Sequence, residues 1–218
     1  MAHIPHLLLP DPWGDDGIEL HAAQRDHLAK VLRRSRGSTV SYTDGAGRRG
    51  EGTWEGDVVA RGTEITVARP SPALCLAVAP PRSRDRARFL VEKLAELGVD
   101  ELCWLETRFG QADPPGDEKA RAWSVGALEQ SRGSWLMEVS GPSSLDELDG
   151  VLVVADLTGS DAVPLGASRY TVLVGPEGGF DESEIPDHSA RVKLSDRVLR
   201  TETAAIVSAA VMLKGLDR

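Results

Sequence analysis

The chain has 218 residues, of which 41% are hydrophobic and 27% charged, and its formal net charge is -9 at pH 7. This length fits one large domain or two modest ones, and the composition is ordinary for a globular protein. No apolar run reaches the roughly eighteen residues of a membrane span, and the N-terminus lacks the pattern of a signal peptide, so we expect a cytoplasmic protein without membrane contact. The acidic balance alone argues against nucleic-acid binding.

The first part of the chain, residues 1–70, has a mostly β pattern and predicts a small barrel-like domain. We expect a helix over His21–Leu32 and then short strands. The strands are predicted at Ser38–Tyr42, Gly52–Trp54, Val58–Val59 and Glu64–Val67, with a hairpin turn at Asp44–Gly47. The prolines in Ala68–Pro72 indicate a linker.

Residues 71–218 alternate between apolar strands and helices, which predicts an α/β domain with a parallel sheet. Predicted strands are Leu74–Ala79, Glu101–Leu105, Val151–Ala155 and Tyr170–Val174; predicted helices are Asp85–Leu97, Asp117–Ser131 and Thr201–Leu216.

Cys75 and Cys103 fall within or beside the apolar strands, where buried free thiols are favoured over a disulfide or a zinc site. The five histidines show no ligand spacing, so we predict no metal.

A glycine-rich loop, Gly175-Pro176-Glu177-Gly178-Gly179, follows the last predicted strand. Loops that leave the carboxyl ends of parallel strands are where α/β proteins bind ligands. Glycines allow a ligand to approach the backbone closely, and Pro176 stiffens the turn. The alternative is a tight turn in which Glu177 merely caps the next element. The loop matches neither common phosphate-binding pattern.

A second segment, Val198–Ala204, opens the last predicted helix. Thr201 is expected to cap this helix, and Glu202 is favoured in its first turn by the helix dipole. Arg200 is out of place there, because a cation is disfavoured at a helix N-terminus. We expect it to have an anionic or polar partner, such as Glu177, Glu202 or a phosphate.

Arginines gather in two stretches, around 30–36 and 82–88. Either stretch alone fits a solvated surface as well as an RNA-binding face. In a chain otherwise rich in acids, the two together favour an RNA-facing surface.

Five blocks of sequence, taken in order, resemble the ribosomal RNA small subunit methyltransferase E family of the SPOUT superfamily. They are His27–Arg33, Glu92–Val99, Glu106–Arg108, Glu129–Arg132, and the glycine-rich loop followed by Leu199-Arg200-Thr201-Glu202-Thr203-Ala204. The resemblance implies a PUA-like RNA-binding barrel over 1–70 and a SPOUT methyltransferase domain over 71–218, with a parallel sheet and a C-terminal trefoil knot. It also implies a homodimer that transfers a methyl group from S-adenosylmethionine to N3 of a uridine in small-subunit (16S) ribosomal RNA. The substrate is either the free RNA or the assembled subunit.

The resemblance also assigns residues. The cofactor-binding positions are Leu173, Gly175, Pro176, Glu177, Gly178, Gly179, Leu194, Val198, Leu199 and Arg200; the catalytic ones are Arg200 and Glu202; the RNA-binding ones are Arg33, Arg34, Arg82, Arg108 and Arg132. The chain departs from the family pattern at Ser195 on the adenine side, and at Gly133, Met137 and Pro81-Arg82 in regions used for RNA.

Two alternatives to this enzyme remain open. One is a non-catalytic RNA-binding or ribosome assembly protein of the same fold, which the departures at Gly133 and Ser195 leave possible. The other is a ribose 2′-O methyltransferase, although Leu199–Thr203 differs from the final loop of that group.

Overall fold

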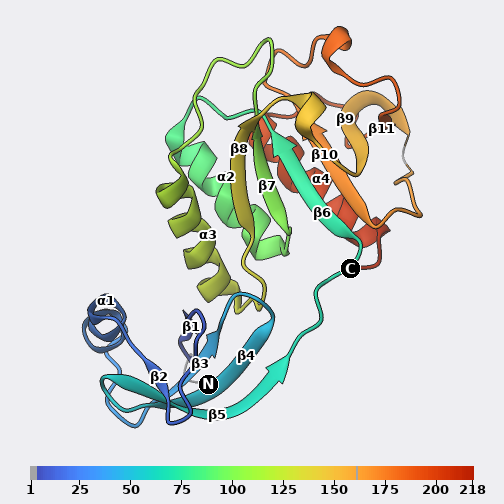
Figure 1. Ribbon diagram of the computed structural model, residues 1–218. Helices are drawn as coiled ribbons and strands as arrows, with labels where there is room; N and C mark the ends of the chain where they lie inside the picture. The colour runs from blue at the N-terminus through green and yellow to red at the C-terminus, as the bar shows by residue number, and fades with distance from the viewer. Residues whose placement is uncertain (1–3, 161) are drawn as a thin grey trace. The chain divides into compact units, whose positions relative to one another are not determined.

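The computed structural model describes residues 4–160 and 162–218 (Figure 1). The chain forms two compact units. The first comprises the chain up to Arg69 together with Leu128–Leu136, and the second comprises Pro70–Ala127 and Met137–Arg218. The return of 128–136 to the first unit has no counterpart in the sequence pattern.

The first unit is built on a five-stranded sheet with the order β1-β3-β4-β5-β2. Its elements are β1 (His6–Leu8), β2 (Ile18–Glu19), α1 (Ala22–Asp26), β3 (Thr39–Thr43), β4 (Arg48–Trp54) and β5 (Val58–Thr66). The pairing of β1 with β3 is parallel and the others are antiparallel. Within the described residues no ladder joins β1 to β2, so the sheet is open and curled. The expected strands at 58–59 and 64–67 are one continuous strand, β5, because β4 pairs with it along its length.

The helix expected over 21–32 is regular only in its first half. After α1 the chain continues as a π-helical turn, His27–Val31, in which the Leu32 N–H donates to the His27 carbonyl at 2.9 Å. Leu28 from this turn is fully buried with Val40, Tyr42 and Trp54. The turn therefore closes the core of the first unit.

The segment 128–136 joins the first unit through polar contacts. Glu129 Oε1 accepts from the Leu8 N–H at 2.9 Å, and His6 Nε2 lies 3.0 Å from the Gly133 carbonyl oxygen. Burial lowers the pKa of His6. His6 is therefore a buried, hydrogen-bonded residue of the sheet, and its burial favours the neutral form.

The second unit contains a six-stranded sheet with the order β11-β9-β10-β6-β7-β8, and every pairing in it is parallel. Its elements are β6 (Ala73–Val78), α2 (Arg84–Leu97), β7 (Glu101–Leu105), α3 (Asp117–Ser131), β8 (Glu138–Ser143), β9 (Val151–Ser160), β10 (Arg169–Val174), β11 (Ala190–Val192) and α4 (Thr201–Gly215), with short 3₁₀ turns at Leu145–Glu147 and Glu182–Glu184. The last turn of α3, from residue 128 on, belongs to the first unit. The predicted parallel sheet is confirmed. Two of its strands, β8 and β11, had no signal in the sequence.

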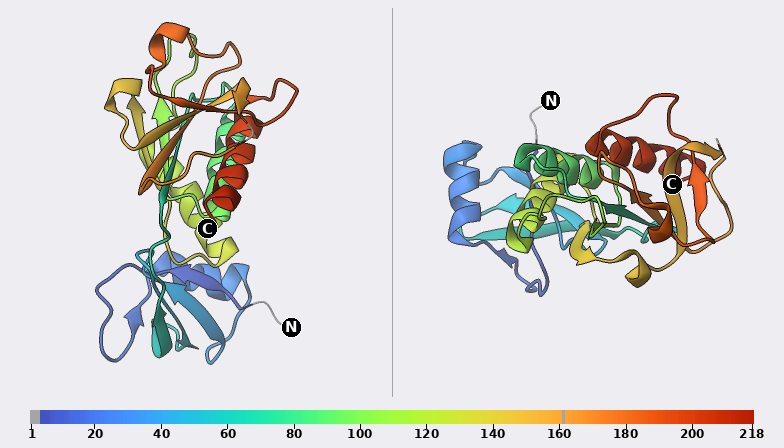
Figure 2. Two further views of the ribbon diagram at one scale, coloured as in Figure 1. Left: turned by 90° about the vertical axis from the view of Figure 1, so that its right-hand side faces the viewer. Right: turned by 90° about the horizontal axis from the view of Figure 1, so that it is seen from above.

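Alternate side chains of the central strands enter two separate cores. On β6, Leu74 and Leu76 pack with α2 and α4, whereas Cys75 and Ala77 pack on the opposite face with Leu145 and Ile185. Figure 2 shows α2 and α4 on one side of this sheet. Both cysteines are buried and free, as expected. Cores on both faces explain the unbroken apolar runs of these strands.

Candidate functional site

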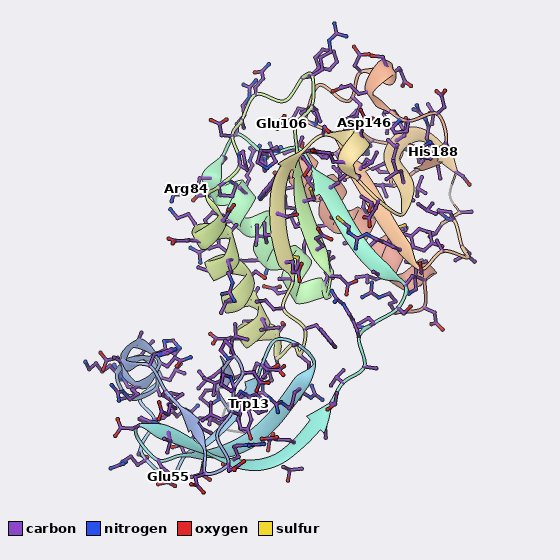
Figure 3. All side chains as sticks on the ribbon, viewed as in Figure 1. Trp13, Glu55, Arg84, Glu106, Asp146 and His188 are labelled. Carbon is purple, nitrogen blue, oxygen red and sulfur yellow. The ribbon has the colours of Figure 1, made fainter. Side chains whose placement is uncertain are left out.

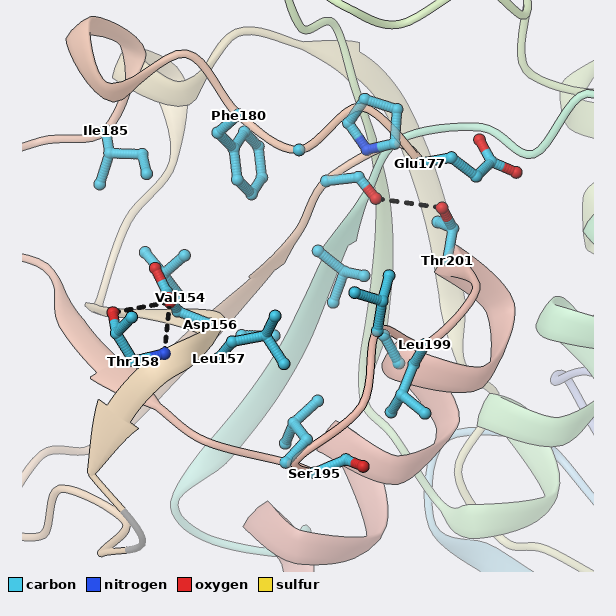
Figure 4. Close-up of a pocket in the computed structure, with 18 of the residues that line it drawn as sticks. Val154, Asp156, Leu157, Thr158, Glu177, Phe180, Ile185, Ser195, Leu199 and Thr201 are labelled. Atoms are coloured by element: carbon cyan, nitrogen blue, oxygen red, sulfur yellow. Dashed lines mark hydrogen bonds between the residues drawn. The ribbon is translucent and has the colours of Figure 1, made fainter.

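A cavity of about 410 Å³ lies at the carboxyl edge of the sheet, the edge where ligands bind in α/β folds. Three segments line it: the end of β9, the loop after β10, and the irregular stretch before α4 (Figure 4). The lining residues are 154–158, 174–177, 179–180, 182, 185, 194–195, 197–199, 201 and 204. We call it the cofactor cavity, because it gathers most of the residues that the family resemblance implies for a cofactor site.

The glycine-rich loop forms one wall of this cavity. Gly179 has φ 76°, and its N–H donates to the Pro176 carbonyl at 2.8 Å, which closes a tight turn. A β-carbon added at Gly175 would lie 3.2 Å from the Phe180 ring. The two glycines therefore serve different needs: a left-handed backbone at 179 and close packing at 175.

The segment 193–200 forms the opposite wall and belongs to no helix or strand. At its two ends the backbone is bonded: the Lys193 N–H donates to the Ser160 carbonyl at 2.9 Å, and the Arg200 carbonyl accepts from the Ala204 N–H at 2.8 Å. Between them, Leu194, Val198 and Leu199 line the cavity. The Ser195 hydroxyl accepts from the Arg197 N–H at 3.1 Å. This side chain caps a local turn where the family pattern has glycine.

The two walls are joined by Thr201, the first residue of α4. Its hydroxyl donates to the Gly175 carbonyl at 3.1 Å, as the dashed line in Figure 4 marks. The expectation that Thr201 caps the helix is wrong. Arg200 is the N-cap residue, with an extended backbone, and Thr201 is committed to the neighbouring loop.

A third wall, at the end of β9, was not predicted. Asp156 Oδ1 accepts from the Thr158 N–H at 2.7 Å and from its hydroxyl at 2.9 Å, and Asp156 Oδ2 pairs with Arg191. These bonds, chiefly the one from the Thr158 N–H, lower the pKa of Asp156. The signal was present: Asp156–Thr158 directly follow the predicted strand Val151–Ala155, at the edge of the sheet where ligands bind. In the structure they continue that strand and belong to β9.

Seven predicted cofactor-binding residues line the cavity and three do not. Those that line it are Gly175, Pro176, Glu177, Gly179, Leu194, Val198 and Leu199. Leu173 is fully buried in the core beneath, and Gly178 lines a neighbouring cavity. Arg200 is exposed beside the wall and, within the described residues, has no ion-pair partner.

Glu202 also lies outside the lining. It is buried, with 7% of its surface exposed, and its Oε1 lies 3.5 Å from Nε of Arg86 on α2. The expected partnership of Arg200 with Glu202 is replaced by this pair between α2 and α4.

Comparison with known proteins identifies the family. Residues 69–213 match the RNA methyltransferase domain family. The chain belongs to this family. A curated relative from Mesomycoplasma hyopneumoniae (strain 232), a ribosomal RNA small subunit methyltransferase E, is 25% identical over 150 residues, which are 61% of this chain and 65% of that protein. The match thus spans just under two thirds of the relative's length.

Solved structures match this chain over almost its whole length. A methyltransferase-like protein from Legionella pneumophila, in complex with S-adenosylmethionine, is 26% identical, with a TM-score of 0.82 and 98% of each chain covered. A predicted RNA methyltransferase from Thermotoga maritima is 27% identical, with a TM-score of 0.73 over 96% of this chain and 98% of that one. A ribosomal RNA small subunit methyltransferase E from Neisseria gonorrhoeae, bound to S-adenosylmethionine, shares the fold at 22% identity and a TM-score of 0.82, over 98% of each chain.

The predicted RNA-binding arginines divide between the two units. In the first unit, Arg33 is exposed, Arg34 is half-buried, and Arg132 donates to the Ile4 carbonyl at 3.0 Å. In the second unit, Arg82 donates to Gln111, and Arg108 Nη1 lies 2.5 Å from Asp181 Oδ2. Arg108 therefore also ties the loop after β7 to the loop after β10.

Residues 4–160 and 162–218 contain no cluster of metal-ligating side chains and no helix long and apolar enough to cross a membrane.

Proposed function

We propose that this protein transfers a methyl group from S-adenosylmethionine to N3 of a uridine in small-subunit ribosomal RNA. One observation carries the proposal: the glycine-rich loop and the segment 193–200, separate in sequence, form opposite walls of a single cavity. The family match and the cofactor-bound neighbour from Legionella pneumophila support it.

The cavity fits the cofactor in size and chemistry. Its volume, about 410 Å³, is within the range of small-molecule sites. Leu194, Val198 and Leu199 offer an apolar wall for adenine, and the irregular backbone around them offers polar groups for its edge. Glu177 is exposed and has no ion-pair partner in the described part of the chain, so its carboxylate is available to a cationic group.

The bound cofactor would supply an electrophilic methyl group on its sulfonium; the S–CH₃ bond breaks as the N3–CH₃ bond forms, and the N3 proton passes to a carboxylate or to water. The protein has to orient the uracil and favour its N3-deprotonated form. Arg200, exposed directly after the cavity wall, is proposed to stabilise the negative charge on the uracil carbonyls. The contact of Glu202 with Arg86 favours a positioning role for Glu202 over a catalytic one. The contact fixes the first turn of α4 and thereby the position of Arg200.

The finer features of the fold are part of the same proposal. The chain leaves β10, reaches the sheet edge at β11, and returns to α4, which packs on β6 and β10; this path is consistent with a trefoil knot. We assign residues 1–70 to a PUA-like RNA-binding domain and 71–218 to the SPOUT domain. Apolar residues of α4 that are not fully buried, such as Val207 and Val211, are proposed to contribute to a homodimer.

Calorimetric titration with S-adenosylmethionine tests the cofactor assignment. The proposal predicts saturable binding by the wild-type protein, whereas a purely RNA-binding protein of this fold need not bind it. Absence of binding heat at a cofactor concentration of about 1 mM, the upper end of typical KM values of enzymes for their substrates, would refute it.

Mass spectrometry of small-subunit RNA from a strain that lacks the gene tests the reaction. The account predicts loss of one 3-methyluridine. Loss of a ribose-methylated nucleotide would instead support the 2′-O alternative, and an unchanged set of modifications would support the non-catalytic one.

A further inference from the structure

A second cavity, of about 430 Å³, opens at the same sheet edge as the cofactor cavity. It is formed by the loops that follow the neighbouring strands β6, β7 and β10. Its lining comprises Pro80, Arg82, Phe109, Gln111 and residues 176–178. We call it the Phe109 cavity. Pro176 and Glu177 line both cavities, so a single loop separates the two.

Phe109 is an exposed aromatic residue held in a fixed loop. Its surface is 44% exposed. The neighbouring Arg108 anchors the loop: its N–H donates to Glu184 Oε1 at 2.6 Å, and its guanidinium pairs with Asp181. The Phe109 side chain also approaches Gly178, where an added β-carbon would lie 3.5 Å from Phe109 Cβ. An aromatic ring that folding leaves open and neighbouring contacts hold in place is suited to stack a base.

Polar groups surround this ring. Arg82 donates to Gln111 Oε1. In the part of the chain that the structure describes, the Gln111 amide N–H groups and the other guanidinium N–H groups of Arg82 have no side-chain acceptor and can donate to a ligand. These donors complement one carbonyl oxygen of a uracil, and Glu177 provides an acceptor for its N3–H. Glu106, which directly follows β7 and is labelled in Figure 3, lies at this same edge.

We propose that the Phe109 cavity binds the target base, unstacked from the RNA, with its face on Phe109 and one carbonyl oxygen toward Arg82 and Gln111. This inference rests on the proposed function, because the cofactor must occupy the adjoining cavity. Enzymes that modify a base take it out of the stack and into such a pocket. The cavity volume is sufficient for one nucleotide.

Kinetics of three variants test the proposal. With RNA from a strain lacking the gene as substrate, Phe109→Ala should lower kcat/KM for RNA about 10- to 100-fold, and Phe109→Trp should retain it to within about threefold, because stacking needs only an aromatic face. Cofactor affinity should not change in either variant. Phe89→Ala is the matched control: Phe89 is 48% exposed on α2 and, like Phe109, lies beside a cation.

Photo-cross-linking provides a readout that does not depend on turnover. RNA substituted with 5-iodouridine should cross-link to the tryptic peptide 109–119 and not to 89–93, the peptide that contains Phe89. If wild-type protein methylates the RNA and Phe109→Ala does so equally well, or if the cross-link forms only elsewhere, this inference is wrong and the proposed function stands. If wild-type protein neither methylates nor cross-links the RNA, the proposed function itself fails, and this inference with it.

Discussion

The cofactor cavity and the Phe109 cavity lie on either side of one loop but are built differently. Backbone turns and aliphatic side chains make most of the first, and its walls are joined by internal hydrogen bonds such as Thr201 to Gly175. Exposed side chains from three loops make most of the second. The cofactor can be recognised by backbone turns that the fold holds in place, whereas the RNA base is recognised by a few side chains. We expect substitutions to affect the two cavities separately.

The largest predicted effect is on stability and comes from a buried ion pair that lies away from both cavities, just before the start of β7. The side chains of Asp100 and Arg218 are buried, 5% and 3% exposed, and Arg218 Nη1 lies 2.7 Å from Asp100 Oδ2. Asp100→Ala leaves the Arg218 charge unpaired and should lower the free energy of unfolding by about 3–5 kcal/mol. Urea unfolding measures this.

Glu96→Ala serves as the control, because it breaks only a surface pair with Lys93 and should cost at most about 1 kcal/mol. Below its unfolding transition, Asp100→Ala should bind cofactor and RNA normally. A parallel loss of both affinities in the folded protein would show that the cavities depend on the whole sheet.

Arg200→Ala should separate chemistry from binding. If Arg200 stabilises charge that develops on the uracil, kcat falls about 10²- to 10³-fold while cofactor affinity is retained. Single-turnover methyl transfer and calorimetry measure the two quantities. Lys214→Ala, near the other end of α4, is the control; equal turnover in both variants would remove Arg200 from the mechanism.

Gly175→Val should damage the cofactor cavity alone. Its β-carbon would press on the Phe180 ring, and such overpacking should weaken cofactor binding about 10- to 100-fold. Gly126→Val is the control, because an added β-carbon on that exposed residue of α3 meets no atom within 4 Å. Binding of 5-iodouridine RNA in the Phe109 cavity should persist. Simultaneous loss of cofactor and RNA binding would contradict the division between the cavities.

The smallest effect concerns Asp156 and pH. Hydrogen bonds hold its pKa below the ordinary value of about 3.9. Its contribution to stability is therefore complete above that ordinary value, and it is lost as the pH falls through the lowered one. The difference in unfolding free energy between wild type and Asp156→Asn should be constant from neutral pH to about pH 5 and shrink below about pH 4. A difference that shrinks between neutrality and about pH 5 would contradict this assignment.

How much the sequence predicts differs between these regions for physical reasons. The glycine-rich loop could be found because an unbroken apolar strand precedes it. Strand β8 could not: it is an edge strand of half-exposed, alternating residues that includes Gly141 and Pro142, and it draws its order from pairing with β7. The role of Thr201 could not be predicted from the sequence either, since its hydrogen-bond partner, Gly175, is 26 residues away.

The same limit explains the second cavity. Phe109 and Gln111 form no local pattern, and only the parallel order of β10, β6 and β7 brings their loop beside residues 176–178. The basic residues of that region signalled RNA without indicating where a base would bind.

The most direct test of the account is methyl transfer by the purified protein. Small-subunit RNA from a strain lacking the gene is incubated with isotopically labelled S-adenosylmethionine, and its nucleosides are analysed by mass spectrometry. The account predicts labelled 3-methyluridine with wild-type protein and with Gly126→Val, and a strongly reduced amount with Gly175→Val at low cofactor concentration. Label in another nucleoside, or no label with wild-type protein, would contradict it.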